Sequence, residues 1–295
     1  MRALITGGAG FIGSHVAAFL ASKGCQVTVL DNLSTGSREN AAGFELIEAD
    51  VRDSSVRMLC EEADAVVHLA AYTSAPGSVE RPAETYETNL RGLFNVMGAR
   101  RLVFASSAAV YGNLPGLPKG EESPTDPTTP YAETKLIGEH LLRDRENAVA
   151  LRFFNVYGER QRPDSDYAAV IPKWIEAVAT GRQPIVYGDG RQTRDFIYVG
   201  DVARAVWLAL QSDGLAGETL NIASGRSISL LELLENIAKR AGTAPTPRFE
   251  PERPGDVRFS SADVSKAERL IGFRAQTGIT EGISRTIDHF RGGLQ

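Results

Sequence analysis

The chain has 295 residues, of which 42% are hydrophobic, so it is long enough to bury one large or two modest cores. Its formal net charge is −5, and lysine and arginine are scattered along it, which argues against nucleic acid or a membrane surface as partner. No stretch approaches 18 consecutive apolar residues, and the apolar start is interrupted by Thr6 and four glycines, so we expect no membrane span and no secretory signal.

Cysteine and histidine are too sparse to suggest a structural role for metals or disulfides. Cys25 and Cys60 are the only cysteines, and the four histidines are far apart in the sequence. We therefore predict no metal site and interpret both cysteines as buried thiols of a cytoplasmic protein.

Short apolar runs alternate with helical patterns over the first half of the chain. The predicted strands are Arg2–Thr6, Gln26–Leu30, Phe44–Glu48, Ala65–Leu69, Leu102–Ala105 and Ala148–Phe153. The predicted helices between them are Phe11–Lys23, Ser54–Glu61, Ala83–Ala99 and Tyr131–Arg145. This alternation predicts an α/β fold around a parallel sheet that is buried on both faces and binds ligands beyond the carboxyl ends of its strands.

After Asn155 the regular alternation of predicted strands and helices ends. Loops rich in glycine, proline and arginine separate predicted helices at Trp174–Thr180, Asp201–Gln211, Leu230–Ala241 and Ile279–Phe290. We predict a first domain over residues 1–155 and a smaller substrate-binding α/β region over 156–295, of which segments such as 195–212 pack back on the first domain.

The first predicted strand leads into a glycine cluster, Gly7–Gly13, that fits both G-x-G-x-x-G and T-G-x-x-G-x-x-G. Without side chains the loop turns tightly, and a pyrophosphate can reach its backbone and the amides of the following helix. Asp31 ends the next strand 18 residues after Gly13, close to the ~20 expected for a ribose-binding carboxylate. We predict a dinucleotide site in which Asp31 favours NAD, while the nearby Arg38 leaves NADP open.

Two further positions after predicted strands carry polar side chains. Asp50 can accept a hydrogen bond from the adenine amino group, and a solvated or capping aspartate is the alternative. Ser107 follows the strand that ends at Ala105, where a hydroxyl can bond an alcohol or ketone. The alternative is that Ser106 and Ser107 satisfy turn amides.

Tyr131 and Lys135 lie four residues apart on a predicted helix that Pro130 opens, so their side chains share one face. An ammonium beside the phenol is expected to lower the pKa of Tyr131 from ~10 toward neutrality, as a base requires. The spacing alone is common on helix surfaces. Its place after a nucleotide site makes the pair our leading catalytic candidate.

Several segments together resemble a known family. They are TGGAGFIG, DNLS, HLAA, SSAAVYG, PYAETK, LRFFNVYG, GDGRQTRDFIYVGDVA and ERPGDVRFSSADVSKAERLIGF. Over nearly the whole chain they resemble the extended short-chain dehydrogenase/reductases, and among these the nucleotide-sugar epimerases typified by UDP-galactose 4-epimerase. The resemblance implies a Rossmann-type, doubly wound sheet, tightly held NAD, a UDP-sugar substrate and a homodimer joined through the helices at Ala83–Ala99 and Tyr131–Arg145.

The resemblance also implies roles for individual residues. Tyr131 would act as the base, Lys135 as the nicotinamide-ribose ligand and Ser107 as the partner of the sugar 4-oxygen. The implied cofactor-binding set is Gly7, Gly10, Phe11, Ile12, Gly13, Asp31, Asn32, Asp50, Val51, Leu69, Ala70, Ala71, Asn89, Tyr131 and Lys135. The implied substrate-binding set is Ser107, Asn155, Val170, Tyr187, Arg194, Arg253, Asp256 and Ser260, in which guanidinium groups suit a diphosphate.

Similar dehydratases and decarboxylases carry acidic residues just before the Val-Tyr-Gly step, where this chain has Ala108 and Ala109. This difference favours 4-epimerisation of UDP-glucose and UDP-galactose through a 4-keto sugar, without net redox. Ser260 stands where narrow-specificity members carry a bulky tyrosine, which implies room for a larger sugar. A 4-epimerase of UDP-N-acetylglucosamine or UDP-glucuronate, a 4-ketoreductase and a non-enzymatic NAD-binding regulator remain alternatives. The intact set of Tyr131, Lys135 and Ser107 argues against the regulator.

Overall fold

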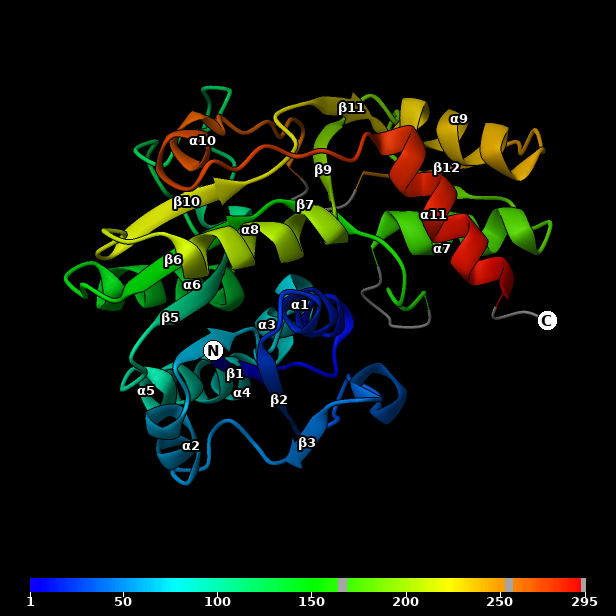
Figure 1. The fold of residues 1–295 in the computed structure, drawn as a ribbon. Helices are drawn as coiled ribbons and strands as arrows, with labels where there is room; N and C mark the ends of the chain where they lie inside the picture. Colours follow the sequence, from blue (N-terminus) through cyan, green and yellow to red (C-terminus); the bar gives the residue numbers. More distant parts are fainter. Residues whose placement is uncertain (164–168, 253–256, 293–295) are drawn as a thin grey trace.

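The computed structural model describes residues 1–163, 169–252 and 257–292. Within them a seven-stranded parallel sheet has the order β10-β6-β5-β4-β1-β2-β3 (Figure 1). The strands are β1 (Arg2–Thr6), β2 (Gln26–Asp31), β3 (Glu45–Glu48), β4 (Ala65–His68), β5 (Leu102–Ser107), β6 (Ala148–Phe153) and β10 (Glu218–Ile222). The chain order reverses between β1 and β4, which is where sheets of this kind bind ligands.

Helices cover both faces of this sheet. One face packs against α1 (Phe11–Ser22) and α8 (Val199–Gln211). The other face packs against α2 (Val56–Glu62), α5 (Gly92–Val96) and α6 (Pro130–Leu142). The inner strands β1, β4, β5 and β6 are buried and mostly apolar, as expected for a sheet covered on both faces, and the predicted doubly wound α/β class is confirmed.

The predicted helix at Ala83–Ala99 is confirmed as a continuous helical stretch from Pro82 to Val96, which contains a π-helical turn that was not predicted. The structure has α4 (Pro82–Tyr86), a π-helical turn η2 (Glu87–Arg91) and then α5, preceded by an unpredicted α3 (Ala75–Glu80). Proline at residue 82 opens α4, and the wider turn at η2 interrupts the regular hydrogen-bond ladder. The helix α3 escapes prediction because its six residues include a Pro-Gly pair, which normally indicates a turn.

Many elements of the second half of the chain gather at one end of the molecule (Figure 1). A small sheet has the order β11 (Ser227–Ser229), β9 (Thr193–Tyr198), β7 (Asn155–Tyr157), and β8 (Ile185–Tyr187) pairs with β12 (Arg248–Glu250). Around them lie α7 (Val170–Ala179), α9 (Leu230–Ala241) and α11 (Ile279–Gly292), which share an apolar core. The short helices α10 (Ser265–Ile271), η1 (Arg38–Ala41) and η3 (Ala108–Tyr111) complete the fold.

The second half of the chain contributes to the first core. β10 pairs with β6 as the last strand of the main sheet, and α8 packs along α1. Val206 of α8 and Leu220 of β10 lie in the same apolar cluster as Leu20 of α1. Elements from both sides of residue 155 thus share one core, as expected for segments that pack back on the first domain. The domain boundary at residue 155 stays a prediction.

The part of the chain that the structure describes contains no helix both long and apolar enough to cross a bilayer. In the same residues no three His, Cys, Asp or Glu side chains are grouped so as to hold a metal ion.

Candidate active site

The glycine loop connects β1 to α1 at the switch point of the sheet. Gly7 has φ +71°, and a Cβ there would lie 2.7 Å from the amide nitrogen of Ala70. A Cβ on Gly13 would lie 2.1 Å from the carbonyl oxygen of Gly7. No side chain caps α1 at Gly10, so amides of its first turn, at Phe11 and Ile12, face the loop without a side-chain acceptor. This cradle fits a pyrophosphate.

Asp31 ends β2 beside the glycine loop. Its Oδ2 accepts a hydrogen bond from the Ala9 amide at 3.0 Å, and its Oδ1 accepts one from the Leu33 amide at 2.8 Å. A carboxylate offers about four acceptor positions, so two remain for ribose hydroxyls. Arg38, which left NADP open in the sequence, is paired with Glu48. The Asp31 carboxylate would repel a 2′-phosphate, and Arg38 is already paired with an acid, so both groups favour NAD over NADP.

Asp50 is already well bonded. It accepts hydrogen bonds from Asn32 Nδ2 at 3.0 Å and from the Arg52 backbone amide at 2.9 Å. The Arg52 guanidinium donates two more at 2.8 Å, and these bonds hold the pKa of Asp50 well below its usual range. The predicted adenine contact of Asp50 stays a prediction, and an amino group would have to share one of these oxygens.

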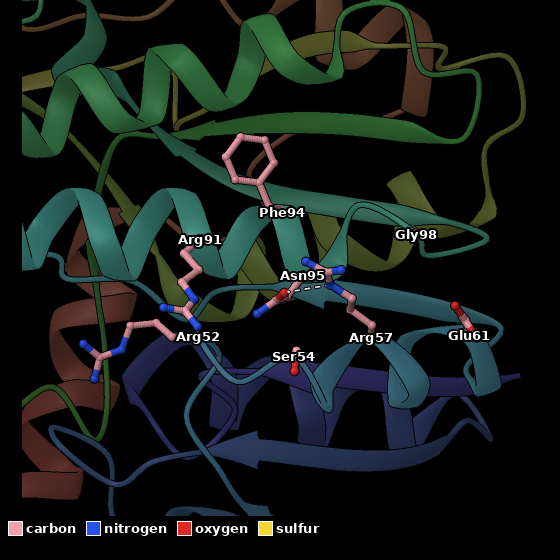
Figure 2. Close-up of a pocket in the computed structure, with 8 residues that line it drawn as sticks. All are labelled: Arg52, Ser54, Arg57, Glu61, Arg91, Phe94, Asn95 and Gly98. Carbon is pink, nitrogen blue, oxygen red and sulfur yellow. Dashed lines mark hydrogen bonds between the residues drawn. The ribbon is translucent and has the colours of Figure 1, made fainter.

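A hollow of about 510 Å³ lies between α2 and α5, and Arg52, the partner of Asp50, is one of the residues that line it (Figure 2). Asn95 stands at its centre, where its Oδ1 accepts a hydrogen bond from Arg57 Nε at 3.0 Å. The Asn95 Nδ2 group donates to the carbonyl oxygens of Val51 at 2.9 Å and Asp53 at 3.1 Å. The wall of the hollow thus fixes the backbone around Val51, a predicted cofactor contact.

The turn after β4 lies against the glycine loop. The Leu69 and Ala70 amides donate to the carbonyl oxygen and the hydroxyl of Thr6, and Ala71 follows them. Asn89 of η2 accepts from the Tyr72 amide at 2.7 Å and donates to Thr134 Oγ1 at 2.9 Å. Asn89, a predicted cofactor contact, therefore also ties this turn to α6.

The catalytic candidates meet where β5 ends and α6 begins. Thr129 caps α6 by accepting from the Ala132 amide at 3.3 Å, so Tyr131 stands in the first turn. The Tyr131 amide donates to Ser78 Oγ at 3.1 Å, a contact to α3 that the sequence did not indicate. The Ser107 hydroxyl accepts from the Ala109 amide at 3.2 Å, and its interaction with the Tyr131 phenol lowers the pKa of that phenol.

Lys135 lies one turn further along α6 and is 4% exposed. Its Nζ is 5.7 Å from the ring centroid of Tyr131 and 5.0 Å from that of Phe104. Burial lowers the pKa of Lys135 to about 7. Burial also raises the pKa of Tyr131, and the bond from Ser107 only opposes this rise. The expected fall in the pKa of Tyr131 is therefore wrong for the protein's own groups, because desolvation disfavours both charged forms.

Two predicted substrate residues lie on neighbouring strands, and a third lies beside one of these strands. β7 pairs with β9, and Asn155 Nδ2 donates to the Asp195 carbonyl oxygen at 2.9 Å, next to Arg194. The Ser260 amide donates to the Thr193 carbonyl oxygen at 3.1 Å, so Ser260 lies at the same strand.

Two others lie on different elements, since Tyr187 ends β8 and Val170 begins α7. Arg253 and Asp256, the remaining predicted ligands, lie outside the described residues. The substrate roles of the whole set stay predictions.

Asp195 is a buried carboxylate that the sequence analysis missed. Its oxygens accept from the Ser224 hydroxyl at 2.6 Å and from the amides of Ser224, Gly225 and Ala262. These bonds join β9 to the turn at 224–225 and to the segment that carries Ser260. The sequence pointed only to the neighbouring Arg194. Asp195 was missed because its hydrogen-bond partners lie 29 to 67 residues away in the chain.

A doubly wound sheet with a glycine cradle at its switch point and a Ser-Tyr-Lys cluster at its carboxyl edge defines a dinucleotide-dependent enzyme of the short-chain dehydrogenase/reductase type. A family model described as "NAD dependent epimerase/dehydratase family" matches residues 3–223. The chain belongs to the NAD dependent epimerase/dehydratase family and uses NAD, as predicted.

The relatives cover the chain from end to end. It is 36% identical over 315 residues to a UDP-glucose 4-epimerase of Mycolicibacterium smegmatis, covering 100% of each chain. It resembles the crystal structure of a Thermotoga maritima UDP-glucose 4-epimerase with UDP-glucose, with a TM-score of 0.95, 34% identity and 100% of each chain covered. It also resembles the Thermus thermophilus UDP-glucose 4-epimerase complex with NAD, with a TM-score of 0.90, 40% identity and 99% of each chain covered.

Proposed function

We propose that this protein is a UDP-hexose 4-epimerase that interconverts UDP-glucose and UDP-galactose through a transient 4-keto sugar. The observation that carries the proposal is the clustering of Ser107, Tyr131 and Lys135 where β5 ends and α6 begins, with Lys135 Nζ 5.7 Å from the Tyr131 ring centroid, at the sheet edge that also holds the glycine loop. The names of the similar proteins support the same reaction.

The chain's own groups suit proton transfer at one hydroxyl. Tyr131 removes the proton of the sugar 4-hydroxyl and later returns it. The Ser107 oxygen accepts from the Ala109 amide, so its single proton can be donated either to the Tyr131 oxygen or, with substrate bound, to the sugar 4-oxygen. When bound, NAD supplies the acceptor for the C4 hydride and the source from which it returns to the opposite face of the ring. The proton and the hydride both return, so no net redox occurs.

A first experiment incubates the purified protein with a panel of UDP-hexoses without added NADH and resolves the C4 epimers by NMR. We expect UDP-galactose to form from UDP-glucose, and we expect Tyr131→Phe to lower the rate by about 10²–10⁴-fold, because the base is lost. Tyr86→Phe, which removes a hydroxyl bonded to Glu133, is the matched control and should retain the activity. A stoichiometric demand for NADH would indicate a ketoreductase, and NAD-loaded protein inert toward the whole panel would favour the regulator.

The breadth of the sugar site depends on Ser260 in this proposal. Its small side chain leaves space that a tyrosine would fill, which supports acceptance of UDP-N-acetylglucosamine as a second substrate. We expect Ser260→Tyr to suppress turnover of UDP-N-acetylglucosamine at least tenfold while UDP-glucose turnover changes little, measured with the same NMR assay. Equal turnover of both sugars by both forms would refute this gating.

We also infer a cytoplasmic homodimer. Phe94 on α5 is 51% exposed and Ile137 on α6 is 37% exposed, so both helices of the proposed interface carry apolar side chains that a second copy can cover. Cys25 and Cys60 are both free thiols, in keeping with a reducing compartment.

A further inference from the structure

A buried ion pair lies beneath the catalytic turn and takes no part in the proposed chemistry. Glu139 on α6 accepts two hydrogen bonds from the guanidinium of Arg152 on β6, at 2.8 and 2.6 Å. The two side chains are only 4% and 5% exposed. Such a pair needs an explanation, because a hydrophobic pair of similar volume is often equally stable in a protein core.

The ion pair is bonded to both ends of the turn that carries Ser107. The Ser106 hydroxyl donates to Glu139 Oε1, and Ser106 immediately precedes Ser107. Arg152 donates to the Tyr111 hydroxyl at 2.8 Å, and Tyr111 closes the short helix η3 that follows Ser107. The turn is thus held from below on each side of the reactive serine.

The same network continues toward the segment that carries Ser260. Tyr111 donates to Asn221 Oδ1 at 2.7 Å. The Asn221 Nδ2 group donates to the carbonyl oxygens of Lys119 at 2.9 Å and Asp263 at 3.1 Å. The chain of hydrogen bonds therefore runs from α6 through the catalytic turn to the predicted sugar-binding segment.

The geometry favours orientation over simple packing. Glu139 stands eight residues, about 12 Å along the helix, from Tyr131 on the same α6. A guanidinium fork on a carboxylate fixes both groups in one plane, which a hydrophobic contact does not. Arg152 therefore sets the position of α6, which carries Tyr131, relative to β5, which carries Ser107.

We propose that Glu139 and Arg152 are positioning residues that hold the Ser106–Tyr111 turn against α6 so that the Ser107 hydroxyl meets the Tyr131 phenol. This inference rests on the proposed function for its kinetic consequence. Its structural consequence, the Ser107–Tyr131 contact, is independent of the substrate.

The test compares two variants of the holoenzyme with the wild type. Glu139→Leu/Arg152→Met removes the ion pair without changing the net charge, and Ser106→Ala removes only the link to the turn. We expect kcat for UDP-galactose to fall about tenfold to hundredfold while KM changes less than about twofold, because the transition-state contact of Ser107 is disturbed. Asp288→Asn/Arg240→Gln, which removes a surface pair between α11 and α9, should leave both constants unchanged.

A second readout separates positioning from general stability. Because the Ser107 bond lowers the pKa of Tyr131, both test variants should raise that pKa. Tyrosine labelled with 13C at Cζ reports it in an NMR titration, with Tyr131→Phe for assignment, and the pH profile of kcat should shift to higher pH.

Folded variants with unchanged kcat and an unchanged pKa of Tyr131 would overturn the proposal. If the wild type lacks epimerase activity, the proposed function fails, and the titration alone decides the positioning role. If the double variant does not fold, Ser106→Ala decides it.

Discussion

Two buried basic side chains lie close to one aromatic ring. His68 and Phe104 have ring centroids 6.0 Å apart, and Lys135 Nζ is 5.0 Å from the centroid of Phe104. Thr6 Oγ1 accepts from the Ala70 amide and shares a hydrogen bond of 2.7 Å with His68 Nδ1. Burial favours the neutral imidazole.

This neutral histidine predicts a stability change with pH. Burial, with a smaller effect of Lys135, lowers the pKa of His68 to about 3. Between pH 6.5 and pH 3 the unfolded chain binds a proton that the folded chain does not, so stability falls as the pH falls through this window. We expect the loss of unfolding free energy from pH 6.5 to pH 5 to be about 1.5 kcal/mol smaller in His68→Gln, measured by urea unfolding. The exposed His140→Gln should show the wild-type loss, and a wild-type loss in His68→Gln would contradict the argument.

The part of the site that depends on short-range residue spacing could be predicted from the sequence. The glycine loop, Asp31 and the pair Tyr131–Lys135 follow rules that depend on a few neighbouring residues. Asp195 and the pair Glu139–Arg152 were not found, because their partners lie far away in the chain and only the fold brings them together. The pKa of Tyr131 was misjudged because spacing reveals a neighbouring charge but not the degree of burial.

The turn between β1 and α1 has no space for a Cβ atom at Gly7 or Gly13. We expect Gly13→Ala to lower the NAD content of the purified protein at least tenfold and to lower its Tm, because the new Cβ would meet the Gly7 carbonyl oxygen. NAD released on denaturation can be quantified by chromatography, and Tm by circular dichroism. Gly278→Ala is the control, since a Cβ there meets nothing within 4 Å. Full NAD content in Gly13→Ala would contradict the close packing of the loop.

Elements with a strong pattern were predicted well, and short ones were not. The six predicted strands lie within two residues of their predicted ends, whereas β10 of the main sheet and β9 were not predicted. The helix α9 matches Leu230–Ala241, helped by the capping box of Ser229 and Glu232. The three-residue strands β7, β8, β11 and β12 show no usable alternation. The short connection from α5 to β5 is held by Asn147, whose side chain donates to the carbonyl oxygens of Ala99 and Arg100.

At the scale of the whole molecule, the exposed apolar side chains on α5 and α6 predict association with a second copy. We expect Phe94→Glu to convert the dimer to a monomer in light scattering, because a desolvated carboxylate in an apolar interface is costly. Met58→Glu on α2, which is also exposed but lies off the predicted face, should remain dimeric. A wild-type protein that is monomeric at micromolar concentration would reject the homodimer.

The crossing of β10 and α8 into the first core also bears on how the chain is made. Until Ile222 has left the ribosome, the nascent polypeptide lacks the strand that borders β6 and the helix that shields α1. An amino-terminal piece released at residue 155 would leave those apolar surfaces bare, open to proteases and to self-association. Folding of the coenzyme-binding half therefore has to wait for much of the half that follows it.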